Sequence, residues 1–183
     1  MAEARQLLGV IGIALGCAVA LAATHTLTAG RIHENESAAA RRLVAGLLPV
    51  AATEPLPDLD RPPAAWDYCG GHLLARSDAR GYGGPIRLLY VLDAESGAAD
   101  GDVAYTLGRV ALLGHQETPG ITDFLDDPAW LEQLSGASAA EIASVDAVSG
   151  ATITSRALTD ALAAAVRDPA AVLGDPLPMG CDP

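Results

Sequence analysis

The sequence predicts an α+β protein, in which one N-terminal transmembrane helix precedes a single domain with a mostly antiparallel sheet and flanking helices. Three observations lead to this prediction. Near its N-terminus the chain has a long apolar run that contains no Asp, Glu, Lys or Arg. Nineteen Gly and twelve Pro, spread through the middle and the tail, suit a loop-rich α+β domain better than a helical bundle. The rest of the chain contains both aliphatic runs bounded by glycines, which are typical of strands, and stretches of helix formers.

The apolar run from Leu7 to Thr28 is the predicted membrane anchor. It contains no Asp, Glu, Lys or Arg, and a helix needs about 20 apolar residues to cross the hydrocarbon core. Signal-peptide cores are shorter, at about 7–15 residues. The length therefore favours a retained anchor over a cleaved signal, which is the alternative that the Ala-rich end of the run leaves open.

Charge excludes one class of partner and says little about orientation. The net charge of -12 repels nucleic acid, and no basic patch with interleaved aromatic residues is present, so we expect no nucleic-acid binding. Arg31, Arg41 and Arg42 follow the span while Arg5 precedes it. The positive-inside rule thus argues mildly against an outside domain, although long domains translocate largely regardless of charge.

A second helix is expected after the anchor. Residues 31–48 contain helix formers throughout and end before Pro49, with an apolar stripe by which a stalk helix would dock on the domain. The stripe consists of Ile32, Leu43, Val44, Leu47 and Leu48. Four prolines between Ala51 and Ala65 predict an extended connector. We therefore divide the chain into an anchor (1–30), a stalk and connector (31–65), a domain (66–169) and a C-terminal tail (170–183).

The domain is predicted to contain sheet first and helix afterwards. Ile86 to Leu92 follows a Gly-rich turn and is the candidate central strand, preceded by a short apolar run at 73–74 and followed by a strand within 103–113. A short helix is expected over 128–134, with Pro at its start. Residues 144–148 are interpreted as a strand that leads through a turn into a helix over 152–167, ended by Asp168-Pro169.

The turn before that last helix carries the candidate chemistry. Its sequence is Asp146-Ala147-Val148-Ser149-Gly150-Ala151-Thr152. A helix start offers unpaired N–H groups and the positive end of the macrodipole, which together seat phosphate. Small residues at 150 and 151 would let a phosphate approach the backbone, and Thr152 would bring a hydroxyl to it. The alternative is a plain helix cap supplied by Ser149 or Asp146.

The motif Asp146-x-x-Ser149-Gly150-Ala151-Thr152 resembles the flavinylation motif of FMN-binding domains in two related respiratory complexes. One is the Rnf electron-transport complex, and the other is the sodium-translocating NADH:quinone reductase; each has a membrane-anchored subunit with such a domain. Three further features resemble the same family in the same order, namely Arg31-Ile32-x-Glu34-Asn35-Glu36, Gly81-Tyr82-Gly83-Gly84-Pro85-Ile86 and His115-Gln116-Glu117-Thr118-Pro119-Gly120. The first of these is similar to the Rnf branch in particular.

The resemblance implies a redox subunit that is not catalytic alone. It implies that FMN is bonded covalently through its phosphate to Thr152 by a separate flavin transferase during maturation. Ser149, Gly150, Ala151 and Asp146 would surround the attachment point, and Glu117 and Thr118 would be flavin neighbours. The other partners would be membrane subunits of an ion-translocating complex linked to ferredoxin and NAD. The domain would lie on the periplasmic side of the cell inner membrane.

Other interpretations remain open at this stage. The chain could be the corresponding subunit of the quinone reductase, or a non-redox membrane-anchored binding domain. We identify no catalytic acid–base pair and no metal-binding cluster in the sequence. A loop His115 bonded to backbone is preferred over a proton donor. A disulfide between Cys69 and Cys181 is a further hypothesis, because thiols in an oxidising compartment tend to pair.

Overall fold

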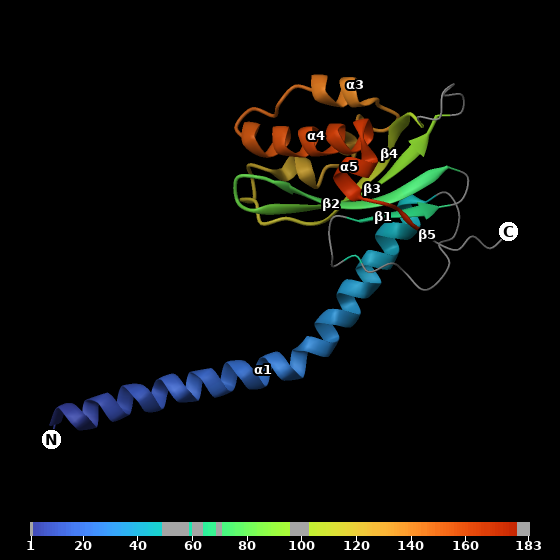
Figure 1. Cartoon of the computed structure of the whole chain (residues 1–183). Coiled ribbons are helices and arrows are strands. Elements are labelled where there is room, and N and C mark those ends of the chain that lie inside the picture. The colour runs from blue at the N-terminus through green and yellow to red at the C-terminus, as the bar shows by residue number, and fades with distance from the viewer. Residues whose placement is uncertain (1, 49–58, 60–63, 69–70, 96–102, 179–183) are drawn as a thin grey trace. The chain divides into compact units, whose positions relative to one another are not determined.

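The computed structural model describes residues 2–48, 59, 64–68, 71–95 and 103–178 of the chain. It confirms the α+β class, with a long apolar N-terminal helix followed by a mostly antiparallel sheet and its flanking helices (Figure 1). The chain forms two compact units, Met1–Ala40 and Arg41–Pro183. Cys69 and Cys181, the hypothetical disulfide pair, both lie outside the described residues.

The first unit consists of the greater part of helix α1 (Ala2–Leu47). All large aliphatic side chains between Val10 and Leu27 are exposed, so this stretch presents an apolar surface around the helix. Within the described residues α1 is the one helix long and apolar enough to cross a membrane, which is compatible with a single-pass anchor. The predicted anchor and stalk are parts of one continuous helix, because no helix-breaking residue separates them before Pro49.

The second unit is built on a five-stranded sheet in the order β4-β3-β2-β1-β5. Strands β1 (Ala64–Tyr68), β2 (His72–Arg80), β3 (Pro85–Ala94) and β4 (Tyr105–Gly114) are antiparallel neighbours. The two-residue β5 (Leu177–Pro178) pairs in parallel with β1. The central strand predicted at 86–92 is confirmed as β3, and the strand within 103–113 is confirmed as β4.

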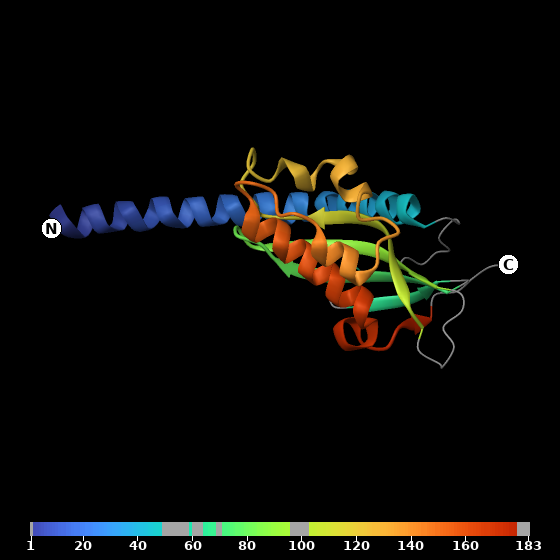
Figure 2. The same ribbon diagram turned by 90° about the horizontal axis from the view of Figure 1, so that it is seen from above.

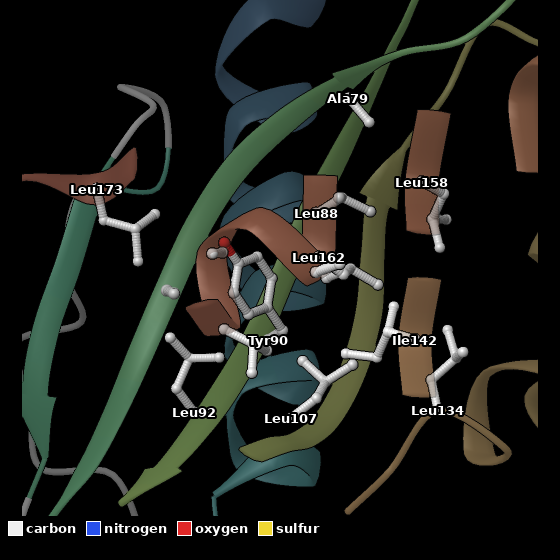
Figure 3. Packing of buried hydrophobic residues seen from close by; sticks show 14 of the residues in the cluster. Ala79, Leu88, Tyr90, Leu92, Leu107, Leu134, Ile142, Leu158, Leu162 and Leu173 are labelled. Atoms are coloured by element: carbon white, nitrogen blue, oxygen red, sulfur yellow. The ribbon is translucent and has the colours of Figure 1, made fainter. Parts of the chain in front are cut away.

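Both faces of the sheet are covered. On one face, α4 (Thr152–Arg167) packs with α3 (Ala139–Ser144) and α5 (Pro169–Leu173) over the strands, as Figures 1 and 2 show. The core beneath them contains Tyr90, Leu107, Leu158 and Leu162 (Figure 3). On the other face, Val44 and Leu47 from the last turns of α1 and Leu48 directly after it are buried against Trp66 and the outer side of β2 and β3. The apolar stripe predicted for the stalk thus includes residues that dock on the sheet.

In the segment before α4, one short helix agrees with the expectation and an expected strand is absent. The helix predicted at 128–134 is confirmed as α2 (Pro128–Glu132), which follows the short 3-10 helix η1 (Asp123–Leu125). The strand predicted at 144–148 is wrong: residues 145–148 have no regular structure and α3 precedes them. Helix α3 begins with a capping box, in which the Ser138 hydroxyl accepts from the Glu141 N–H while the Glu141 carboxylate accepts from Ser138.

The last described residues, 168–178, form α5 and the short strand β5. Asp168 caps α5 by accepting from the Ala171 N–H at 3.0 Å, and Leu173 is buried in the main core. Leu177 then pairs with Trp66 of β1. The described part of the predicted tail is therefore packed against the domain.

Candidate functional site

Helix α4 starts at Thr152 without a side-chain cap. Its N-cap residue is Ala151, with φ -124° and ψ 31°, and no side chain bonds the first N–H groups of the helix. The interpretation that Ser149 or Asp146 caps this helix is therefore wrong. Gly150 precedes the cap with φ +84°, a left-handed conformation that glycine adopts without strain. The free N–H groups and the helix dipole make this end of α4 attractive to an anion.

A buried serine holds the turn in place from beneath. The Ser155 hydroxyl accepts from the Val148 N–H at 3.0 Å and donates to the Ala151 carbonyl oxygen at 3.0 Å. Ser155 is 1% exposed, so this link does not compete with solvent. The sequence reasoning missed Ser155, although a Ser at the fourth residue of a helix commonly bonds back to a preceding carbonyl.

A pocket of about 310 Å³ opens at the start of α4. It brings together five of the residues singled out in the sequence, namely Glu117, Thr118, Gly150, Ala151 and Thr152. Ser149 and Asp146 do not line it and lie exposed in the same turn. The pocket therefore joins the loop after β4 to the helix start, two segments that are more than thirty positions apart in the sequence.

The remaining pocket walls are mostly apolar. Tyr82, Ile121 and Ile153 line the pocket and are 79%, 54% and 60% exposed. Exposed large apolar side chains around a concave polar floor are a common feature of ligand sites. Tyr82 lies inside the motif at 81–86, and Ile121 directly follows the motif at 115–120. Neither was singled out as a site residue from the sequence, because neither occupies one of the polar positions of these motifs.

Glu117 lies at the inner end of the pocket and is almost fully buried. Its carboxylate accepts from the Gly83 N–H at 2.9 Å and from the Thr154 hydroxyl at 2.8 Å. The same hydroxyl of Thr154 accepts from the Tyr82 N–H at 3.3 Å. These bonds tie the Gly-rich turn before β3, the loop after β4 and the first turn of α4 into one unit.

His115 belongs to this loop but not to the pocket lining. Its Nδ1 accepts from the Glu117 N–H at 3.3 Å, and its Nε2 lies 3.7 Å from the Asp126 carboxylate. The preference for a loop histidine bonded to backbone is therefore confirmed. The ring orders the loop that carries Glu117.

The geometry fits an anionic ligand with a flat apolar part. Free N–H groups at the start of α4 suit a phosphate, the exposed Thr152 hydroxyl stands beside them, and Tyr82 and Ile153 offer apolar surface. The lining side chains comprise hydroxyls, one carboxylate and apolar groups. They can bind and orient a ligand, whereas electron transfer would come from the ligand itself.

An exposed apolar helix followed by such a pocketed α+β domain defines a candidate membrane-anchored, cofactor-carrying protein. Residues 81–167 match the model of a family described as the FMN-binding domain. The matched segment runs from the Gly-rich turn to the last residue of α4 and contains every residue that lines the pocket. The match supports the FMN-binding family and FMN as the cofactor. No curated protein matches the chain.

Proposed function

We propose that this chain is the membrane-anchored, electron-carrying subunit of an Rnf-type, ion-translocating respiratory complex linked to ferredoxin and NAD. FMN would be bonded through its phosphate to Thr152. The observation that carries the proposal is the position of Thr152 at the uncapped start of α4, within the pocket and within the segment that matches the FMN-binding family.

Different residues of the pocket would bind the phosphate and the rest of the flavin. The N–H groups at the start of α4 would receive the phosphate, with Gly150 and Ala151 leaving its approach free of bulky side chains. Thr118 and the apolar walls would border the rest of the molecule. The flavin, once bound, supplies the ability to exchange electrons singly or in pairs. A covalent tether retains it on a domain that faces an open aqueous compartment.

The attachment step balances as a transfer from FAD. The Thr152 oxygen forms a bond to the phosphorus of the FMN half while the pyrophosphate bond of FAD breaks. AMP leaves, and the hydroxyl proton passes to solvent or to a base on the separate flavin transferase. The modified chain therefore gains FMN less one water, with no change in oxidation state.

Attachment can be tested with two threonines that line the same pocket. The full chain is coexpressed with a flavin transferase, and the denatured band is examined on a gel under ultraviolet light. We expect Thr152→Val to lose the flavin fluorescence, because the bonding oxygen is gone, and the exposed neighbour Thr118→Val to keep it. Equal fluorescence from Thr152→Val and wild type would refute attachment at Thr152. Absence of covalent flavin from wild type would refute covalent attachment, and a non-redox binding domain would then be favoured only if the native protein also bound no FMN.

Orientation forms part of the same proposal. We infer that the domain lies on the periplasmic side of the inner membrane, as the family resemblance implies and against the weak arginine bias around the span. A periplasm-dependent reporter joined to the end of the chain is expected to be active. Activity of a cytoplasm-dependent reporter instead would contradict this localisation.

A further inference from the structure

The carboxylate of Glu117 is buried without a cationic partner among the described residues. It is 7% exposed, and none of the described ion pairs includes it. A buried carboxylate is costly unless donors satisfy it. Here the Gly83 N–H and the Thr154 hydroxyl each supply a hydrogen bond, at 2.9 Å and 2.8 Å. Both oxygens therefore have a protein donor, which connects Glu117 to the turn before β3 and to α4.

Glycine permits the turn before β3 to come this close. A Cβ at Gly83 would lie 2.5 Å from the Gln116 carbonyl oxygen, and a Cβ at Gly81 would collide with the Glu117 carboxylate. The neighbouring Tyr82 N–H donates to the Thr154 hydroxyl. The result is a closed ring of bonds among Glu117, Gly83, Tyr82 and Thr154, whose members come from three segments distant in sequence.

This ring of hydrogen bonds fixes Thr154 on one side of the first turn of α4. Thr152 lies on the opposite side of the same turn. Each residue advances an α-helix by about 100°, so positions 152 and 154 point about 200° apart. Thr154 is 1% exposed and bonded inward, whereas Thr152 is exposed at the pocket. Fixing Thr154 therefore fixes the direction in which the Thr152 hydroxyl and the first N–H groups of α4 point.

We propose that Glu117 and Thr154 are positioning residues: they act through each other and Gly83 to orient the start of α4 for modification of Thr152. This inference rests on the proposed function. It assigns to Glu117 a role that needs no contact with the flavin, and it gives Thr154 a role that the sequence motif did not include.

A matched pair of buried threonines on α4 tests the proposal. Thr154→Val removes the hydroxyl that bonds Glu117. Thr159→Val removes a similarly buried hydroxyl that bonds only carbonyls of its own helix, those of Ser155 and Arg156. Each variant is made in the full chain, its melting temperature is measured, and all assays are run where every variant is folded. Two readouts are compared: the rate of FMN attachment from FAD by the flavin transferase, and amide hydrogen exchange of the apo protein at residues 82–84.

We expect Thr154→Val to slow FMN attachment about ten-fold, because a misdirected reacting group loses much of its orientation advantage. Its 82–84 amides should exchange faster in the absence of any flavin. Thr159→Val should keep both values within about two-fold of wild type, and Thr154→Ser should restore both. Glu117→Gln is the second variant. Its amide has one accepting oxygen in place of two, so either the Thr154 hydroxyl or the Gly83 N–H loses its acceptor, and the variant should reproduce the slower attachment.

The outcomes separate the two proposals. If wild type is modified at Thr152 but both valine variants are slowed equally, or Thr154→Val keeps the wild-type rate, the positioning role is refuted while the proposed function stands. If wild type gains no FMN at Thr152, the proposed function itself fails, and the positioning role fails with it.

Discussion

Replacing Gly83 with Ala should destabilise the domain by overpacking and by weakening one hydrogen bond, without backbone strain. Gly83 does not have a positive φ, so the change introduces no left-handed strain. The new Cβ would lie 2.5 Å from the Gln116 carbonyl oxygen and 3.1 Å from the Glu117 Cα, both backbone atoms. Relief requires the turn and the loop to separate, which also stretches the 2.9 Å bond from the Gly83 N–H to Glu117.

The magnitude follows from these two effects. Overpacking costs about 1–3 kcal/mol, and weakening a hydrogen bond to a charged group adds up to about 1.5–3 kcal/mol. We therefore expect a loss of about 2–5 kcal/mol from a stability on the order of 5–15 kcal/mol. For a domain of this size the melting temperature should fall by about 10 °C or more.

The assay is thermal unfolding of the full chain in detergent, followed by fluorescence of Trp66 and Trp130, which both report on the second unit. Gly46→Ala is the matched control, because a Cβ at this α1 position meets no atom within 4 Å and Ala favours a helix. Its melting temperature should be unchanged or higher. A Gly83→Ala melting temperature within about 2 °C of wild type would refute the close packing of this turn against the loop.

Two further predictions concern the core. Burial raises the pKa of Tyr90 from 10.0 to about 12, against the smaller opposing effects of the Ser77 hydrogen bond and the Arg76 charge. Between these pH values the folded protein keeps a proton that the unfolded chain has released, so this contribution to stability is intact below pH 10 and is lost as the pH rises to about 12. Urea unfolding should show the free energy of unfolding falling with pH in this range. A Tyr90→Phe variant with the same fall would contradict the prediction. Leu158→Ala, at a fully buried α4 position, should lower the free energy of unfolding by about 2–5 kcal/mol in the same assay. The control Asp160→Ala, at an exposed α4 position, should change it by less than about 0.5 kcal/mol. Equal losses of stability would show that the Leu158 face of α4 does not pack on the sheet.

Local signals explain which elements the sequence predicted well. Helix α4 was placed from Thr152 to Arg167 because a Gly-containing turn precedes it and Asp168-Pro169 cannot continue it. Strand β3 was recognisable as a continuous aliphatic run after the Gly-rich turn. In both cases the information lies within a few residues of the element itself.

Elements that depend on distant partners were harder to predict. Strand β2 extends to Arg80, although only its apolar start at 73–74 was evident. Its later residues include the buried Arg76, which is stabilised by bonds to the Leu59 and Ser77 carbonyls and to Asp78. Such a residue has no apolar signal in the sequence. The parallel pairing of β5 with β1 likewise joins positions over 100 residues apart.

In the candidate site, too, features with a local sequence signal were predicted, whereas features that depend on distant partners were not. The motif around Thr152 and the loop containing Glu117 were found separately, through local patterns and a family resemblance. Their meeting in one pocket, the walls at Tyr82 and Ile121, and the bond from Thr154 to Glu117 all require the tertiary fold. In contrast, the missed helix α3 had a usable local signal, the Ser138-x-x-Glu141 capping box.

The most direct test of the account is the mass and position of the modification on the wild-type chain. After coexpression with a flavin transferase, trypsin cleavage at Arg109 and Arg156 releases residues 110–156, which contain Thr118, Thr122, Thr152 and Thr154. Because all four threonines line the pocket, fragment ions must locate the added group. We predict a mass increase of FMN less one water on Thr152. An unmodified peptide, or the same increase on any other residue, would contradict the account.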